Sequence, residues 1–332
     1  MAMTDLRAYL TNLGESLTTL RDSLRALADL LLPRTCIVCG CRLGIRERHL
    51  CLSCAADVPY TRFWLQAHNP MADRFNAVLE RHRGTERMDY AYAAALMYYK
   101  GPYRSIPRAL KYHGDISAGR FYGSLLGRRL ASVPHFADVD LIIPVPLHWS
   151  RRWSRGYNQA EILARALAAG MASGRCGRDL ASAGGIVSER RNASARCRAD
   201  LLVRARRTRT QTRLSVEEKS RNVASAFRVP DHFSLRHRFV VLLSQFRYRL
   251  VSLWPHPSEA DKRRPSRAGH FQPDLESPAI VLASARHIVL IDDTFTTGAT
   301  LYACYATIRP YTSARISIVT LAVVEGTPSA GP

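Results

Sequence analysis

The stretch that decides the fold is His287-Ile-Val-Leu-Ile-Asp292-Asp293-Thr294-Phe295-Thr296-Thr297-Gly298-Ala299-Thr300. Ile288 to Ile291 form a short apolar run rich in β-branched residues, which predicts a buried strand of an α/β sheet. Asp292 and Asp293 are expected to end this strand, at the edge where open α/β sheets place their ligands. Carboxylates there can accept hydrogen bonds from sugar hydroxyls or face a Mg²⁺ ion. A plain polar turn would also contain such a pair, so the pair alone decides little.

A Thr/Gly-rich turn follows the carboxylates and consists of Thr296, Thr297, Gly298, Ala299 and Thr300. We expect this turn to open a helix that continues to Ile308. Free backbone N–H groups, threonine hydroxyls and the positive end of the helix dipole would then converge on one anion. Gly298 would let the backbone approach that anion closely. Strand, carboxylates and turn together are typical of a site for a sugar phosphate.

Four cysteines near the N-terminus form two Cys-x₂-Cys pairs separated by eleven residues: Cys36, Cys39, Cys51 and Cys54. This spacing predicts a closed, tetrahedral and therefore structural Zn²⁺ site. Two disulfides are the alternative, which is less favoured because no signal peptide precedes the module and the cysteines beyond it are scattered singly. Cys41 and His49 lie close enough in the sequence to replace one ligand.

The chain is strongly basic, with 48 Lys and Arg against 27 Asp and Glu and a formal net charge of +21 in 332 residues. Such a charge favours polyanionic partners, including single-stranded DNA. Much of the excess is arginine within residues 190–213 and 236–267. A coding bias that places arginine in solvated loops explains this pattern equally well, so both explanations stay open.

No apolar segment approaches the roughly 20 residues that a membrane-spanning helix needs. The N-terminus also lacks a basic start followed by an apolar core, which is typical of a signal peptide. We therefore expect a cytoplasmic protein without a transmembrane segment.

The remaining pattern predicts three parts. Leucines at three- and four-residue steps indicate an amphipathic helix within residues 1–33, and the four-cysteine module follows over 34–60. Residues 88–325 are expected to form an α/β domain, with strands over 90–99 and 139–145 and helices over 105–112, 117–132 and 157–169. This alternation predicts a parallel sheet covered by helices.

Two segments look irregular. Residues 171–200 are rich in Gly and Arg, and residues 232–285 are expected to be an insertion that is mostly disordered. A surface loop, a binding arm and an error in gene prediction are all possible origins of the insertion.

Several motifs stand between the cysteine module and the Thr/Gly-rich turn: Tyr99-Lys-Gly-Pro-Tyr-Arg104, Leu110-Lys-Tyr-His-Gly-Asp115, Pro144-Val-Pro-Leu-His-Trp-Ser-Arg-Arg-Trp-Ser-Arg-Gly-Tyr-Asn-Gln-Ala160, Gln211-Thr-Arg-Leu-Ser215 and Arg221-Asn-Val-Ala-Ser-Ala-Phe227. In this order they resemble the ComF (late competence, GntX-like) family, over roughly residues 30–230 and 286–325. The resemblance implies a type I phosphoribosyltransferase-like domain behind a zinc finger. It also implies a link to DNA uptake, with competence or DNA-processing proteins as partners, or to nucleotide metabolism.

The resemblance further implies that the site binds phosphoribosyl pyrophosphate (PRPP) together with Mg²⁺. Asp292 and Asp293 would hold the ribose hydroxyls, and residues 296–300 would wrap the 5′-phosphate. Arginines after the second strand suit a pyrophosphate group, so the candidates for it are Lys111, Arg151, Arg152 and Arg155. A surface turn with solvated arginines is the alternative for that loop, and His113 and His148 are expected to be structural.

Two functions remain open after these steps. The first is an active PRPP-dependent phosphoribosyltransferase, in which positioning and electrostatic stabilisation carry the catalysis. The second is a non-catalytic DNA-handling protein that keeps the PRPP pocket as a sensor or a relic.

Overall fold

The structure, a computed structural model, describes Asp29 and residues 33–82, 89–112, 114–181, 195–205, 226–230 and 276–326, with only the backbone described over 175–181. The chain divides into two compact units, and the larger one begins at Pro59. The expected N-terminal helix lies outside the described residues except for Asp29. His113, the motifs over 211–225 and most of the insertion 232–285 lie outside them as well.

The smaller unit contains the four cysteines and one short helix, α2 (Leu52–Ala56). Arg34 and Glu47 brace its turns. The Arg34 guanidinium donates to the Glu47 carbonyl at 2.9 Å and to the Gly44 carbonyl at 3.1 Å. The Glu47 carboxylate accepts from the backbone N–H groups of Gly44 and Leu52, both at 2.6 Å. These bonds hold the two cysteine pairs in a fold too small for a large apolar core.

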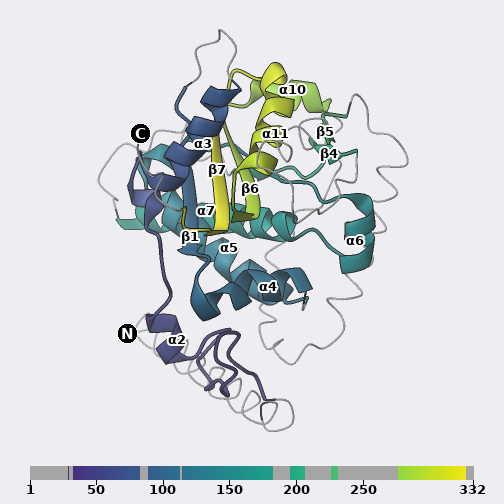
Figure 1. Ribbon diagram of the computed structural model, residues 1–332. Coiled ribbons are helices and arrows are strands. Elements are labelled where there is room, and N and C mark those ends of the chain that lie inside the picture. The colour runs from purple at the N-terminus through teal and green to yellow at the C-terminus, as the bar shows by residue number, and fades with distance from the viewer. Residues whose placement is uncertain are drawn as a thin grey trace, which may run out of the picture. The chain divides into compact units, whose positions relative to one another are not determined.

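The larger unit is built around a five-stranded parallel sheet with strand order β1-β7-β6-β2-β3 (Figure 1). Its strands are β1 (Ala93–Tyr98), β2 (Leu141–Pro144), β3 (Arg196–Cys197), β6 (His287–Phe295) and β7 (Arg315–Val323). A separate two-stranded antiparallel ribbon is formed by β4 (Val203–Arg204) and β5 (Phe227–Arg228). The predicted α/β class with a parallel sheet is therefore confirmed.

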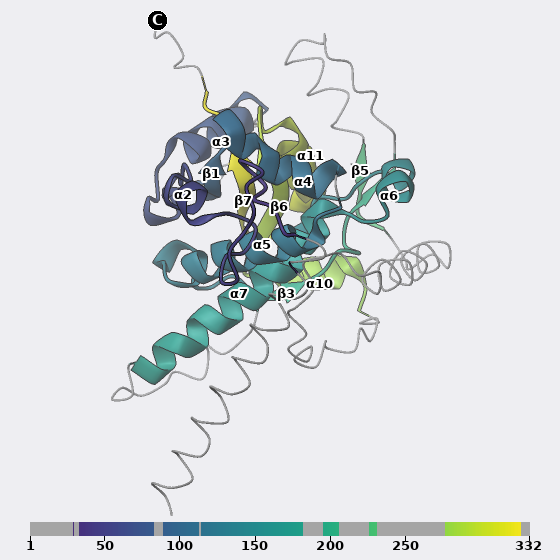
Figure 2. The ribbon, with the colours of Figure 1, turned by 90° about the horizontal axis from the view of Figure 1, so that it is seen from below.

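Helices cover both faces of the sheet, as the end-on view in Figure 2 shows. α5 (Ile116–Ala131) and α7 (Gln159–Ala181) lie on one face, and α3 (Pro70–Arg81) and α11 (Ala299–Ile308) lie on the other. Ile288 and Leu290 of β6 point into the core beside α3 and α11. Alternate residues of a strand face opposite sides, so the buried Val289 and Ile291 face α5 and α7.

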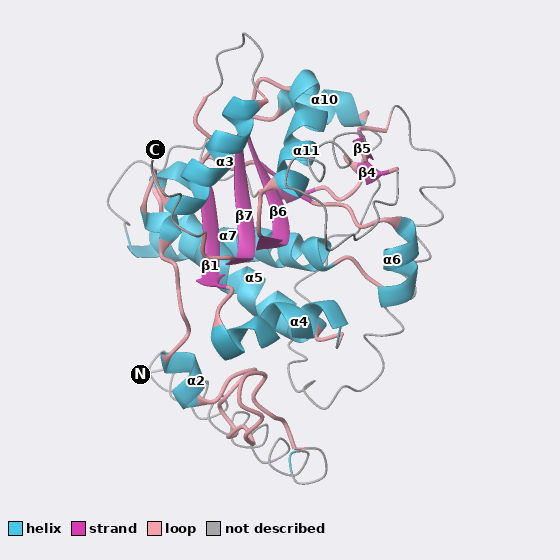
Figure 3. Cartoon of the chain, viewed as in Figure 1, coloured by secondary structure: helices cyan, strands magenta, loops and turns pink. Residues whose placement is uncertain are grey.

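The remaining helices connect these layers (Figure 3). They are α4 (Ser105–Tyr112), α6 (Trp149–Arg155), α10 (Pro278–Ser284) and the short 3₁₀ turns η1 (Phe63–Leu65), η2 (Gly101–Arg104), η3 (Pro134–Phe136) and η5 (Arg309–Tyr311).

Four expectations about these elements are wrong. The carboxylates do not end β6, because its pairing with β7 continues through Asp292↔Thr320 to Phe295↔Val323. The expected loop after β2 contains helix α6, and α7 runs on to Ala181 into a segment expected to be loose. Residues 278–284, expected to be disordered, form α10, whose Val281 and Leu282 side chains are buried.

Two helices approach each other closely because glycines line their contact. α5 contributes Gly119, Gly123 and Gly127, and α7 contributes Gly170. A Cβ atom added at Gly127 would lie 2.2 Å from the Leu167 carbonyl oxygen, and one at Gly170 would lie 2.2 Å from the Ser124 carbonyl oxygen. The absence of these side chains sets the distance between α5 and the helix that supports β2 and β6.

At the amino end of β6, His287 is fully buried and bonded on both ring nitrogens. Nδ1 is 2.7 Å from Asp138 Oδ1, and Nε2 is 2.8 Å from Ser317 Oγ. The hydrogen bond and charge of His287 lower the pKa of Asp138. Although the residue types are those of a nucleophilic triad, Ser317 is also fully buried, so this network fastens β6 to β7 and has no access to a substrate.

Candidate functional site

The order of the strands creates a switch point between β2 and β6. β2 is followed along the chain by its neighbour β3, whereas β6 is followed by its neighbour β7 on the opposite side. Ligands of open α/β sheets bind outside the carboxyl ends of the strands at such a point. The two strand ends are joined there by a hydrogen bond of 2.9 Å from the Val145 N–H to the Ile291 carbonyl. The segment after β2 and the carboxylates of β6 therefore meet at one edge.

The two adjacent carboxylates have different environments, because neighbouring residues of a strand face opposite sides of the sheet. Asp293 is buried and forms an ion pair with Lys111 of α4, with 2.8 Å between Oδ1 and Nζ. Asp292 accepts a hydrogen bond of 2.8 Å from the Asp293 N–H. The predicted residues Asp292, Asp293 and Lys111 are thus brought together.

Burial and the charges of neighbouring groups shift the pKa values of these residues. Burial and the negative charge of Asp293 raise the pKa of Asp292 to about 7, although Lys111 and Arg204 act in the opposite direction. Burial opposes the charged form of Lys111, but Asp293 and Asp292 raise its pKa overall. Strongly perturbed groups in a cluster of this kind are typical of functional sites.

The Thr/Gly-rich turn lies directly after β6 and leads into α11. Gly298 is the residue before the helix, with φ of +80°, and no side chain caps the helix there. The helix itself starts at Ala299, whose N–H reaches the Thr297 hydroxyl only at 3.5 Å. The first N–H groups of α11 consequently form a site where an anion can accept hydrogen bonds.

Arg74 of α3 braces this turn and was missed by sequence reasoning. Its guanidinium donates to the Thr296 carbonyl and, at 2.8 Å, to the Val324 carbonyl after β7. It also lies 5.1 Å from the centre of the Phe295 ring. Residue 74 carries no local signal, because all three partners come from the other end of the chain.

The three arginines predicted after β2 lie on helix α6, but they do not have equivalent roles. Arg152 is held by Glu161, with 3.2 Å between Nη2 and Oε2. Arg155 lies 5.4 Å from the centre of the Tyr112 ring. The positive charge of Arg151 is, after burial, a cause that lowers the pKa of Arg204 of β4.

His148 precedes α6 and has a structural role, as expected. It is buried, and its Nδ1 lies 2.8 Å from the Ser150 hydroxyl and accepts the Ser150 N–H at 3.3 Å. The ring therefore caps α6 and fixes the direction in which its arginines project.

In the smaller unit the four predicted cysteines come together. Their Sγ atoms all lie within 4.8 Å of one another, and the Cys39 and Cys51 sulfurs are 3.7 Å apart. Tetrahedral Zn–S bonds of about 2.3 Å place sulfurs about 3.8 Å apart. Hydrogen bonds from the Cys41 backbone and from neighbouring thiols lower the pKa of Cys39 to about 6, whereas burial raises the pKa of Cys54. This group can hold a metal ion such as zinc.

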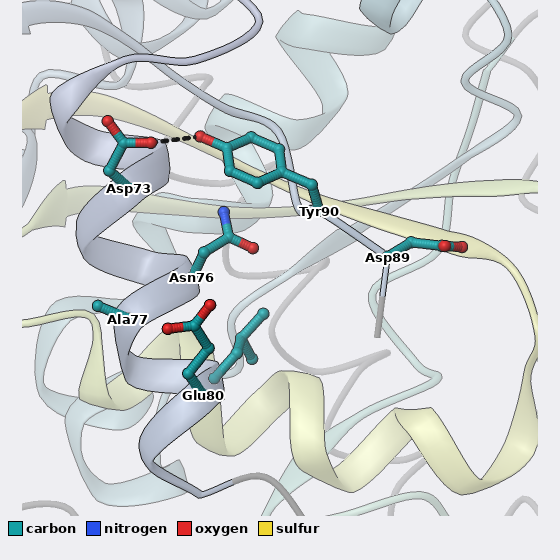
Figure 4. Close-up of a pocket in the computed structure, with 7 residues that line it drawn as sticks. Asp73, Asn76, Ala77, Glu80, Asp89 and Tyr90 are labelled. Carbon is teal, nitrogen blue, oxygen red and sulfur yellow. Dashed lines mark hydrogen bonds between the residues drawn. The ribbon is translucent and has the colours of Figure 1, made fainter. Parts of the chain in front are cut away.

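A cleft of about 320 Å³ lies against the outer side of α3 and is lined by Asp73, Asn76, Ala77, Leu79, Glu80, Asp89 and Tyr90 (Figure 4). Three of these residues are acidic. Within the cleft the Tyr90 hydroxyl donates to Asp73 at 2.6 Å, and the Asn76 amide is bonded to the backbone of Ala72 and Ala91. Its negative charge makes the cleft unsuitable for a phosphate.

No protein-family model matches the sequence, and no curated protein matches it either. No helix in the described part of the chain combines the length and apolar composition that crossing a bilayer requires. The function therefore has to be inferred from the chemistry of the two sites and from the motifs.

Proposed function

We propose that this chain is a ComF-type protein whose α/β unit has a phosphoribosyltransferase-like fold and binds PRPP with Mg²⁺ at the carboxyl ends of β2 and β6. One observation carries the proposal. At the switch point of a parallel sheet, an uncapped helix begins six residues after Asp293, the buried member of the carboxylate pair, and Lys111 forms an ion pair with Asp293. An anion site next to hydroxyl-binding carboxylates matches the chemistry of a sugar phosphate.

Each group has a defined role in this proposal. The N–H groups at the start of α11 and the threonine hydroxyls of residues 296–300 bind the 5′-phosphate. Asp292 and Asp293 accept hydrogen bonds from the ribose hydroxyls. Lys111 and Arg151 face the pyrophosphate. Bound Mg²⁺ would neutralise part of the pyrophosphate charge, and the carboxylates and phosphate oxygens are the ligands it prefers.

The expected chemistry is transfer of the phosphoribosyl group to an acceptor nucleophile. The bond between C1 of the ribose and the pyrophosphate oxygen breaks, and its electron pair leaves with the pyrophosphate. Positive charge develops on the ribose beside the carboxylates, and negative charge develops beside Lys111 and Arg151. The acceptor then forms the new bond to C1. Preorganised charges of this kind stabilise such a transition state without reorganisation.

Isothermal titration with PRPP and Mg²⁺ tests the proposal. Asp293→Asn keeps the shape but removes a charge, and hydrogen bonds to charged groups contribute about 1.5–3 kcal/mol. The affinity should therefore fall about ten- to a hundredfold. Asp89→Asn, the same change in the acidic cleft, should leave it unchanged.

Wild-type protein that does not bind millimolar PRPP would refute the proposal, as would an Asp293→Asn variant that binds as tightly as the wild type. Isotope-labelled PRPP incubated with candidate acceptors separates a transferase from a sensor that binds without turnover.

A second candidate function, binding of single-stranded DNA, is favoured by the surface around α6. Trp149 and Trp153 are 67% and 70% exposed, and Tyr112, which Arg155 overlies, is 70% exposed. Exposed aromatic rings beside arginines suit stacking of unpaired bases. The double variant Trp149→Ala, Trp153→Ala should weaken binding of an oligothymidine at least tenfold, whereas Tyr311→Ala should not. If the wild type and both variants bind the oligothymidine equally well, this surface is not the DNA-binding site.

The four-cysteine unit is proposed to hold one structural Zn²⁺. The closed set of sulfur ligands leaves no open coordination position for a substrate.

A further inference from the structure

The corner between α6 and α7 consists of Gly156, Tyr157 and Asn158. α6 ends there because Gly156 has a φ of +82°, which glycine adopts without strain, and its N–H donates to the Arg152 carbonyl at 2.8 Å. Tyr157 and Asn158 are both buried, so their polar side-chain groups need partners inside the protein. These partners lie on two different elements of the candidate site.

Asn158 fastens this corner to the ends of the strands. Its amide donates to the Val145 carbonyl, directly after β2, at 3.1 Å, and its Oδ1 accepts from the Ala160 N–H at 3.2 Å. Val145 is in turn bonded to Ile291, the residue before Asp292. The corner therefore has a fixed position relative to the carboxylates of β6.

Tyr157 fastens the same corner to α4. Its hydroxyl donates to the Leu110 carbonyl, which lies in the last turn of that helix. Because α4 ends at Tyr112, no residue of the helix can donate to this carbonyl. The Leu110 side chain is buried and lies against α5, where it would be the nearest contact of a Cβ atom added at Gly119. The last turn of α4 is therefore held from two sides.

Lys111 follows Leu110 directly and is the residue of α4 that reaches the carboxylates. Its Nζ is 2.8 Å from Asp293 Oδ1, and its side chain is 27% exposed. A lysine side chain is long and flexible, so it loses much conformational freedom when an ion pair holds it in one geometry. Fewer geometries compete with the ion pair when the backbone that carries the side chain is already fixed. The bond at the preceding carbonyl therefore favours the ion pair.

We propose that Tyr157 is a positioning residue for Lys111: its hydroxyl holds the Leu110 carbonyl, and this directs the Lys111 side chain to Asp293. The ion pair forms without a ligand, so this role goes beyond the proposed PRPP site, and only its consequence for PRPP binding rests on that site. Tyr157 contacts no ligand and acts through the lysine alone. A tyrosine that merely fills the core would add to stability and leave Lys111 unaffected.

Nuclear magnetic resonance of the lysines tests this role without any ligand. Reductive methylation with ¹³C-formaldehyde gives each lysine a methyl peak and keeps its charge. Lys111→Arg identifies the Lys111 peak by its absence, and Asp293→Asn gives the position of that peak without the ion pair. At one fixed pH, Tyr157→Phe should move the Lys111 peak at least about half of the way to that position. The chain has only four lysines, Lys100, Lys111, Lys219 and Lys262.

Tyr122→Phe is the matched control, because it removes the hydroxyl of another buried tyrosine, on α5. It should leave the Lys111 peak in place, and melting temperatures of all variants identify any change in folding. A Lys111 peak that stays in place in Tyr157→Phe, or moves equally far in Tyr122→Phe, overturns the proposal. A wild-type peak that coincides with that of Asp293→Asn overturns it without any change at Tyr157.

Titration with PRPP and Mg²⁺ shows whether the lysine carries the effect to the proposed ligand. Tyr157→Phe should weaken PRPP binding about three- to tenfold, and Lys111→Gln should weaken it further. The double variant should bind like Lys111→Gln alone, since the hydroxyl acts through the lysine. Losses that multiply in the double variant would overturn the proposal. Wild-type protein that binds no PRPP, although the Lys111 peak moves in Tyr157→Phe, would overturn the proposed function and leave the role of Tyr157 in place.

Discussion

Replacement of Gly127 by alanine should destabilise the α/β unit, although alanine is the better helix former. The added Cβ would lie 2.2 Å from the Leu167 carbonyl oxygen and 2.9 Å from the Met171 nitrogen, both of them backbone atoms. An ordinary contact begins at 3.4 Å. Backbone cannot rotate away, so α7 would have to move by about 1 Å from α5.

The magnitude follows from two opposing terms. Alanine in place of glycine within a helix is favourable by about 1 kcal/mol. Overpacking a tight contact costs about 1–3 kcal/mol or more, and the upper end applies where backbone must shift. The net free energy of unfolding should therefore fall by about 1–2 kcal/mol, which lowers the melting temperature of a unit of this size by about 2–8 °C.

Gly119→Ala is the matched control on the same helix. Its Cβ would lie 2.7 Å from Leu110 Cδ1 and 3.1 Å from Ile162 Cγ2, which are both side-chain atoms and not backbone. The free energy of unfolding should change by less than about 0.5 kcal/mol, because the gain in helix propensity offsets the rearrangement. Urea unfolding followed by far-ultraviolet circular dichroism measures both variants, and a Gly127→Ala protein as stable as Gly119→Ala would refute the reasoning.

Three further predictions concern the metal, the pH and the turn. Cys51→Ser should abolish binding of one Zn²⁺ per chain and unfold the small unit, because metal binding contributes about 10–16 kcal/mol in such sites. Cys41→Ser should keep the metal. Elemental analysis of both variants measures the zinc content. Because the pKa of Asp292 is raised, the folded protein keeps a proton at this carboxyl that the unfolded chain has lost, so the free energy of unfolding should fall as the pH rises from about 4 to about 7 and level off above that. The Asp292→Asn variant should lack this fall. Urea unfolding measures both proteins across this range, and a wild type whose stability does not fall would show that the assignment is mistaken. Gly298→Val should weaken PRPP binding at least tenfold, because valine disfavours a φ of +80° and its side chain would press on the Phe295 ring. Cys304→Ser should bind PRPP as tightly as the wild type. Calorimetry measures both variants.

The parts of the fold that local pattern determines could be predicted from the sequence. The apolar run Ile288–Ile291 predicted a strand and the following residues a turn and helix, and β6 and α11 lie there. The length of β6 was not predictable, because it depends on pairing with β7. Helix α6 was missed because its tryptophans are exposed, so no buried face gives it a helical pattern.

The candidate site was predictable only where its residues are contiguous or belong to the motifs. The carboxylates, the turn and Lys111 belong to this class, and the spacing of the cysteines likewise indicated their cluster. Arg74 acts through partners distant in the sequence and stands among many other arginines. Nothing local distinguishes a guanidinium that braces a turn from one in a solvated loop.

The bonds of Arg74 have a consequence for the order in which the chain folds during synthesis. Arg74 and Thr296 are 222 residues apart, so α3 leaves the ribosome long before the turn that it supports. Contacts over such a separation form late, because a large loop must close first. The Thr/Gly-rich turn is therefore expected to acquire its final shape only after β7 has been made, and a nascent chain should not bind the proposed ligand before then. A chain truncated after α11 would contain every predicted site residue. It would lack Val324, whose carbonyl accepts a hydrogen bond from Arg74, so Arg74 would be held less firmly against the turn.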